Sequence, residues 1–240
     1  MADNLLYTIL LAVMVLLLFA VGEMLHIYAK VKAEYTRKLI HAGTGGITLL
    51  CPLLITNHWY VLALCASFAL LLLTSIKLGF LKSINDIGRE SFGSVSYAVA
   101  VYVCFDAYWW QKDRIFFYLP MLILAIADPL AALVGQKFQY GKFKVFKETK
   151  TLSGSIMFFV MAILVAAGCI YFHRIYTLEK IIWIPIAIAF ISTLAESFTI
   201  KGLDNITIPI VVLIFMVVIR HYEIGMWEKL NMVYMHGVVH

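Results

Sequence analysis

The chain has 240 residues, of which 63% are hydrophobic and only 14% are charged, and its formal net charge at pH 7 is +5. Soluble domains are usually about 45–50% apolar and about 25% charged, so this composition excludes a soluble globular protein and indicates a polytopic membrane protein. The excess of basic residues does not indicate a nucleic-acid partner, because the lysines and arginines lie in short loops between apolar stretches, where they set membrane topology.

The apolar stretches are long enough to cross a bilayer as helices, which takes about 20 residues each. We therefore predict an all-α bundle, a single domain over residues 1–240, with about eight transmembrane helices. The count falls to seven if the second is discounted, because His41 and nearby glycines interrupt it. The first is expected to be a retained helix and not a signal peptide, since it lacks a basic start. The predicted helices cover residues 5–27, 39–56, 58–76, 93–110, 115–135, 154–172, 181–199 and 207–221.

Lysine and arginine are distributed unevenly between the two ends of these helices. Thirteen of the 19 lie in the loops of one side, which the positive-inside rule places in the cytoplasm. The polar segments 37–43, 85–94, 127–154 and 196–209 all fall on that side. The sequence therefore predicts one site at the cytoplasmic face of a multi-pass membrane protein, with both termini on the opposite side.

Four polar residues lie at or near the inner ends of apolar helices, where an acid costs at least about 2.5–3.5 kcal/mol on insertion scales. They are Asp128, Glu196, Asp204 and Asn205. Oxygen ligands of this kind suit Mg²⁺, which usually takes one or two carboxylates together with phosphate oxygens. We predict Asp128, Asp204 and Asn205 as metal ligands, and Asp128, Asp204 and Glu196 as catalytic groups. The alternative is that the acids form ion pairs with Lys150 or Lys201, or are solvated at the interface.

The segment between Gly135 and Gly154 combines lysines, hydroxyls and glycines in a way that is typical of phosphate binding. It lacks the spacing of a Walker A loop. The alternative is a basic loop that only obeys the positive-inside rule. The predicted nucleotide-binding residues here are Gly135, Lys137, Gly141, Lys147, Lys150, Thr151, Gly154 and Ser155.

A second group of cations lies at the entry of the second predicted helix and before the fourth. Arg37 and His41 are four residues apart and share one helical face, so we predict that they act together in phosphate or proton handling. Lys38 and Arg89 are predicted to bind the nucleotide. The alternatives are a topology anchor with a packing histidine at positions 37–41, and a local ion pair between Arg89 and Glu90.

Four segments in this order resemble the polyprenol kinase family, which includes phytol, farnesol and dolichol kinases and is related to the phosphatidate cytidylyltransferases. They are RKLIHAGTG, GRESFGSVSY, ADPLAALVGQKF with the following KTLSGS, and ESFTIKGLDNITIP, within residues 23–209. The chain departs from the family pattern at two places. In the family's G-R-x-F-G, Gln136 replaces the arginine, and the second glycine comes two residues later, at Gly141. In K-T-x-E-G-S, Ser153 replaces the acid.

The resemblance implies an enzyme, a kinase that phosphorylates a membrane isoprenoid alcohol, such as phytol, geranylgeraniol, farnesol or a polyprenol, and the predicted metal ligands make Mg²⁺ its expected cofactor. It implies CTP as the donor, with ATP as the alternative, and related membrane transferases suggest a homodimer. Two related activities stay open, a cytidylyltransferase-like synthesis of CDP-lipids and a diacylglycerol kinase. A transporter is disfavoured, because the acids cluster at one interface and the chain has no inverted repeat.

Overall fold

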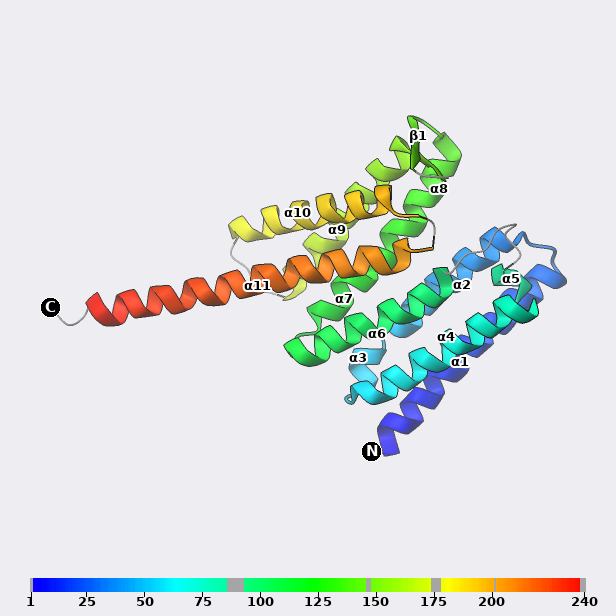
Figure 1. Cartoon of the computed structure of the whole chain (residues 1–240), viewed down its shortest axis with the longest axis horizontal. Helices are drawn as coiled ribbons and strands as arrows, with labels where there is room; N and C mark the ends of the chain where they lie inside the picture. Colours follow the sequence, from blue (N-terminus) through cyan, green and yellow to red (C-terminus); the bar gives the residue numbers. More distant parts are fainter. Residues whose placement is uncertain (1, 86–92, 146–147, 174–177, 201, 238–240) are drawn as a thin grey trace.

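The computed structural model describes residues 2–85, 93–145, 148–173, 178–200 and 202–237, and in these ranges the chain is almost wholly helical. The predicted all-α fold is confirmed (Figure 1). The first half contains α1 (Ala2–Ile27), α2 (Ala33–Thr48), α3 (Cys51–Leu54), α4 (His58–Leu78), α5 (Lys82–Asn85) and α6 (Gly93–Gln111). The second half contains α7 (Ile115–Leu122), the π-helical turn η1 (Ile123–Ala127), α8 (Asp128–Phe138), α9 (Leu152–His173), α10 (Leu178–Phe198) and α11 (Asp204–Gly237).

Several helices are suited to a bilayer, as the composition predicts. Within the described residues, five segments are long and apolar enough to cross a membrane: Asp3–Ile27, His58–Leu78, Ile115–Phe138, Leu152–His173 and Asp204–Tyr222. A sixth apolar helix, Ile182–Phe198, is shorter. The chain is therefore an integral, multi-pass membrane protein.

The second predicted span is not one helix. Residues 39–56 divide between α2 and α3, with a turn at Leu49 and Leu50. The cause is Pro52, which lies near the start of α3. Proline has no backbone N–H, and in a continuous helix its ring would clash with the carbonyl of Thr48, four residues earlier. Thr48 is accordingly the last residue of α2. The break leaves α2 as a short, polar helix at one end of the bundle.

The predicted fifth helix is continuous but changes its winding just before Asp128. The turn η1 covers Ile123–Ala127 and passes directly into α8, with Pro129 at the start of α8. Pro129 cannot donate to Ala125 four residues earlier, so the regular ladder of hydrogen bonds is interrupted here. Single π-helical turns of this kind occur often at functional sites.

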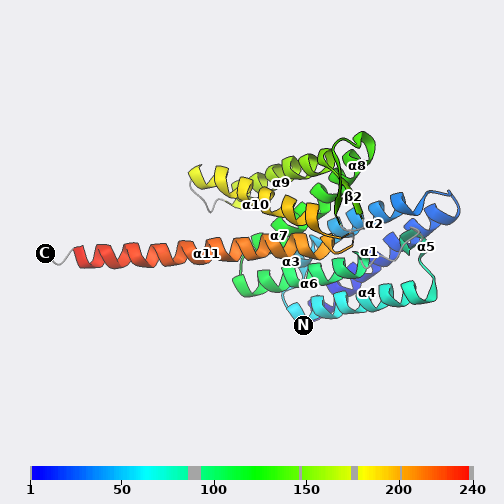
Figure 2. The same cartoon turned by 45° about the horizontal axis from the view of Figure 1, so that its top comes forward.

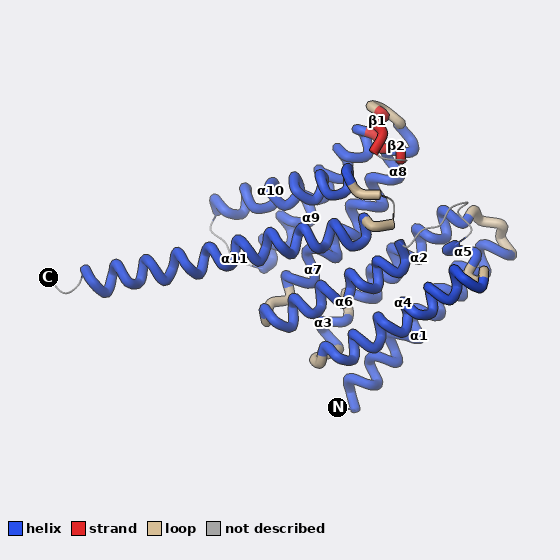
Figure 3. Tube along the Cα trace, viewed as in Figure 1, coloured by secondary structure: helices blue, strands red, loops and turns tan. Residues whose placement is uncertain are grey.

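The segment that we predicted as a phosphate loop contains two short strands, a local exception to the helical fold (Figure 3). β1 (Lys142–Val145) pairs antiparallel with β2 (Glu148–Thr151), so that Lys142 faces Thr151. The chain leaves α8 through Gln139 and Gly141, both in the left-handed region with φ of 45° and 63°. The hairpin therefore lies where α8 ends and α9 begins.

The helix ends that carry the predicted site residues gather at one end of the bundle (Figures 1 and 2). The start of α2, α6 and α11, the end of α8 and the hairpin all lie there. α1 packs on α2, α4 on α6, and α11 on both α6 and α10. At the opposite end α11 extends past the bundle to Gly237, well beyond the predicted end at residue 221.

Candidate active site

A cavity of about 210 Å³ opens between α1, α2, α4, α6, α8 and α11. One side, which we call the polar end, is lined by Arg37, Lys38, His41, Asp128, Asp204 and Asn205. The other side is lined by apolar residues of α1, α3, α4 and α6. Six predicted site residues from three separate segments of the chain thus meet in one volume.

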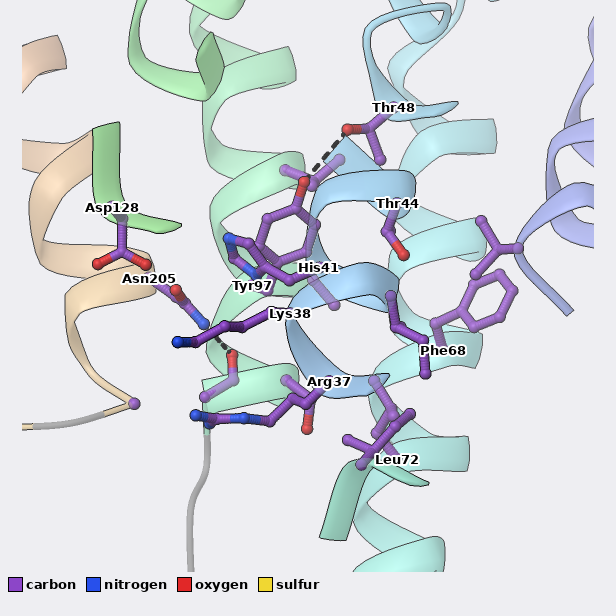
Figure 4. A pocket seen from close by; sticks show the side chains of 18 of the residues that line it. Arg37, Lys38, His41, Thr44, Thr48, Phe68, Leu72, Tyr97, Asp128 and Asn205 are labelled. Carbon is purple, nitrogen blue, oxygen red and sulfur yellow. Dashed lines mark hydrogen bonds between the residues drawn. The ribbon is translucent and has the colours of Figure 1, made fainter. Parts of the chain in front are cut away.

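The polar face of α2 forms one wall of this cavity. Arg37, His41, Thr44 and Thr48 follow one another at helical spacing and all line it (Figure 4). Three buried atoms on this face, Arg37 Nε, His41 Nε2 and Thr44 Oγ1, have no hydrogen-bond partner among the described residues. Buried polar atoms are nearly always hydrogen-bonded, so unpartnered atoms in a cavity wall indicate a ligand.

The ring of His41 is held in place by the aromatic ring of Tyr97 on α6. The two rings make an edge contact with their centroids 4.8 Å apart. The Tyr97 hydroxyl lies 3.4 Å from Thr48 Oγ1, which ties α6 to the end of α2. His41 is therefore a positioned side chain with one ring nitrogen left for a ligand.

The acidic wall comes from the starts of α8 and α11. Asp204 Oδ1 accepts hydrogen bonds from the backbone N–H groups of Gly202 and Asn205, both at 3.0 Å. Asn205 Nδ2 donates to the Gly93 carbonyl at 2.7 Å, which fixes its amide relative to α6. Asp128, placed by the turn η1, is close enough to interact electrostatically with both Asp204 and Glu196. Figure 4 shows Arg37 and Lys38 extending from α2 toward Asp128 and Asn205.

These oxygens fit a metal ion that arrives together with phosphate. Among the described residues, no three or more His, Cys, Asp or Glu side chains form a group that holds a metal ion by itself. Asp128 and Asp204 nevertheless line the same cavity as the amide of Asn205. Mg²⁺ is usually bound by one or two carboxylates, waters and substrate phosphates, and two carboxylates with an amide oxygen match that set.

Glu196 and Lys150 are paired with each other and do not line the cavity. Lys150 Nζ donates to Glu196 Oε1 and to the Glu196 carbonyl, both at 2.5 Å. Each side chain is only 10% exposed. Ser197 Oγ donates to Glu196 Oε2 at 3.3 Å and lies 3.0 Å from Ser155 Oγ. This is the ion pair that the sequence left open as the alternative for the acids, and it anchors β2 to α10.

The predicted phosphate-binding residues around α9 have structural contacts of their own. Thr151 Oγ1 accepts from the Gly154 N–H at 3.2 Å, which is the bond of a helix N-cap. A Cβ on Gly135 would lie 2.6 Å from Thr151 Oγ1 and 3.4 Å from Gly154 Cα. Both glycines are helical, so they serve the close crossing of α8 and α9 and not a positive φ.

The remaining predicted nucleotide residues divide into two groups. Lys137 is exposed at the end of α8, with its ammonium 5.4 Å from the centre of the Phe138 ring, and Gly141 supports the turn into the hairpin. Neither lines the cavity. Arg89 and Lys147 lie outside the described residues.

The close crossing of α8 and α9 can be tested with two alanine substitutions on the same helix. Gly154→Ala is expected to destabilise the protein by about 1–3 kcal/mol, because the new methyl group meets the Ala131 carbonyl at 3.1 Å. Gly168→Ala is the control, since nothing lies within 4 Å of its Cβ, and it is expected to cost nothing. Thermal unfolding in detergent measures both, and equal melting temperatures would contradict the crossing.

Sequence reasoning missed several polar residues that line the cavity. Thr44, Thr48 and Tyr97 were not singled out, although Thr44 lies three residues after His41 and so shares its helical face. Gln136 was noted only as a replacement for the family arginine. Lys38 Nζ donates to Gln136 Oε1 at 3.3 Å, which links α2 to α8 at the edge of the cavity.

Comparison with known proteins places the chain in a family. It is 30% identical over 190 residues to a phytol kinase of Synechocystis sp., which covers 79% of this chain and 81% of that protein. The chain belongs to the polyprenol kinase family, in which the phytol kinases fall. A probable chloroplastic phytol kinase 1 of Glycine max is 25% identical over 194 residues, or 73% of this chain and 63% of that protein. No family model and no solved structure matches the chain. The family that the four motifs indicated is thus confirmed.

Proposed function

We propose that the protein is a lipid-alcohol kinase, which transfers the terminal phosphoryl group of CTP to the hydroxyl of a membrane isoprenoid alcohol. The observation that carries this proposal is the cavity itself, in which acids, cations and an apolar wall share one volume. The relatives named phytol kinase support the acceptor class. The choice of CTP rests on the motif resemblance.

Phosphoryl transfer depends mainly on positioning and on the neutralisation of charge. Asp128, Asp204 and Asn205 would hold Mg²⁺, which would neutralise charge on the phosphate oxygens. Arg37 and Lys38 extend from α2 toward Asp128 and Asn205 (Figure 4), so they contact the same phosphates from the opposite wall. The end of α8 and the hairpin lie at this end of the bundle (Figure 1), and Lys137 of α8 with Lys142 and Lys144 of β1 would receive the rest of the nucleotide.

The hydroxyl of the alcohol binds at His41. The Nε2 atom of His41 is buried and lacks a hydrogen-bond partner among the described residues, and the His41 side chain lines the cavity. The alcohol oxygen forms a new bond to the terminal phosphorus as the bond to the departing CDP breaks, and His41 accepts the hydroxyl proton. Glu196, which the sequence predicts as a catalytic group, is held by Lys150 and Ser197, and its negative charge acts electrostatically on Asp128.

The reaction takes place at the cytoplasmic face, because the positive-inside rule assigns the basic segments to that face. The start of α2, the hairpin and the start of α11 lie together at one end of the bundle (Figure 1). CTP is a soluble metabolite and reaches that face directly. The alcohol reaches the cavity from the inner leaflet.

The experiment uses the purified protein in lipid nanodiscs with Mg²⁺ and γ-labelled CTP or ATP. The acceptors are phytol, geranylgeraniol, farnesol, dolichol, diacylglycerol and phosphatidic acid. Transfer of label from CTP to an isoprenoid alcohol, with release of CDP, is the expected result. Pyrophosphate release with phosphatidic acid alone would assign the chain to cytidylyltransferase chemistry. Absence of transfer from folded protein, with every acceptor and either donor, would reject the kinase.

A further inference from the structure

The cavity continues away from its acids into an apolar arm between α2, α4 and α6. We use this name for the part lined by Cys51, Leu64, Cys65, Phe68, Leu72 and Val101. Leu64, Phe68 and Leu72 are four residues apart on α4 and form one stripe of about 12 Å. The arm lies across α2 from the acids: Figure 4 shows Phe68 and Leu72 on one side of α2 and Asp128 on the other.

One end of the arm, which we call its closed end, is formed by residues of the larger hydrophobic cluster, the main core. Cys51, Cys65 and Val101 are 1%, 8% and 3% exposed, and they belong to this cluster together with Val61 and Phe105. A ligand that enters from the polar end therefore reaches buried side chains of the main core here.

The smaller core of the protein is built around this space. Its buried residues are Val15, Phe19, Ile40, Leu72 and Ile84, and all five line the cavity. Protein interiors are packed as densely as organic crystals, so a core arranged around an open volume lacks some of its contacts. An apolar cavity of about 150 Å³ already binds small hydrocarbons, and this cavity is larger. An apolar ligand would supply the missing contacts.

The ligand must also have one polar end. His41 Nε2 and Thr44 Oγ1, which lack partners in the described part of the chain, lie on α2 where the polar end meets the arm. A molecule with a single hydroxyl and a long hydrocarbon chain satisfies both walls at once. A water cluster would leave the apolar wall unfilled, and an alkane would leave the polar atoms unpaired.

We infer that the apolar arm holds the isoprenoid tail of the acceptor alcohol, and that the side chains at its closed end set the chain length that the enzyme prefers. This inference rests on the proposed function for the identity of the hydroxyl-bearing ligand. Cys65 and Leu64 are the principal determinants, because both line the arm where it meets the main core. Each methylene that the arm buries is expected to favour binding by about fourfold.

Two substitutions change the depth of the arm in opposite directions. Cys65→Phe fills its closed end and is expected to lower the ratio of kcat/KM for phytol over that for geraniol at least tenfold. Leu64→Ala deepens the arm and is expected to raise the ratio for geranylgeraniol over farnesol about threefold or more. Cys169→Phe is the matched control, because Cys169 is half-buried on α9 and does not line the cavity. It should leave these ratios within twofold of wild type.

A second measurement does not depend on catalysis or on the folding of Cys65→Phe. A phytol analogue with a diazirine at the end of its tail is photocrosslinked to the wild-type protein in nanodiscs. Crosslinks on α4 near Cys65 or on α6 near Val101, competed by phytol, are expected. Crosslinks confined to lipid-facing residues such as Leu70, which is 64% exposed, would overturn the inference.

The outcomes separate the inference from the proposed function. An inactive wild-type protein whose tail crosslinks fall in the arm would reject the kinase and retain the tail site. An active protein in which Cys65→Phe and Leu64→Ala lower activity equally at every chain length would retain the kinase and reject the tail site.

Discussion

Asp128→Asn is expected to lower phosphoryl transfer at least about 1000-fold, which corresponds to about 4 kcal/mol of transition-state stabilisation. The substitution keeps the size of the side chain but removes one of the two charges that we propose as ligands of Mg²⁺ at the polar end of the cavity. It also removes a negative charge that is repelled by those of Asp204 and Glu196, so folding should not suffer. Asp204→Asn should lower activity in the same way, because it removes the other charge. Its fold should be kept, because the new amide oxygen can still accept from the N–H groups of Gly202 and Asn205.

The measurement is initial-rate transfer from γ-labelled CTP, with a Mg²⁺ titration for each variant. Asp204→Asn should also need more Mg²⁺ for half-maximal activity. The control is Asp106→Asn on α6, where Asp106 Oδ1 lies 3.5 Å from His58 Nδ1 and away from the cavity lining. It should retain activity within about twofold. Asp128→Asn protein with more than a tenth of wild-type activity would contradict the role of Asp128.

The acids and the charged face of α2 could be predicted from sequence because each is costly inside a membrane and therefore needs a purpose. Asp128 interrupts an apolar run, and Arg37 and His41 have helical spacing. Neither inference required knowledge of how the helices pack. The structure adds that these groups, which lie in three distant segments, face one volume.

Other features depended on local signals that hydropathy does not read. Pro52 and Pro129 are visible in the sequence, and their missing N–H groups account for the end of α2 and for the turn η1. Hydropathy averages over such positions and therefore predicted an unbroken helix at each. The hairpin was missed because four-residue strands next to a left-handed turn carry little periodic signal.

The contacts that individual polar side chains and glycines make were the least predictable feature. Lysines near glycines are typical of a phosphate site, yet Lys150 donates to Glu196, Thr151 caps α9, and Gly135 and Gly154 allow two helices to cross. The same residue types serve both purposes, and only the spatial arrangement separates them. A family motif marks important positions, but it does not say whether a residue there binds a ligand or makes a structural contact.

Lys150→Met is expected to have the largest effect on stability, a loss of about 3–5 kcal/mol, because it leaves the carboxylate of Glu196 buried without its cation. Asp128 interacts electrostatically with that carboxylate and would add to the repulsion. The measurement is thermal or denaturant unfolding in detergent. Lys144→Met is the control, since Lys144 is exposed on β1 of the same hairpin, and it should change stability by less than about 0.5 kcal/mol.

The double variant Lys150→Met/Glu196→Gln distinguishes a structural pair from a catalytic acid. With both charges removed, no unpaired ion remains, so most of the lost stability should return, and the coupling energy of the double-mutant cycle measures the pair. If His41 accepts the proton, the double variant should keep at least about a tenth of wild-type activity. A variant that regains its stability but is inactive would move the proton-accepting role to Glu196. A variant as unstable as Lys150→Met alone would show that the pair is not what joins β2 to α10.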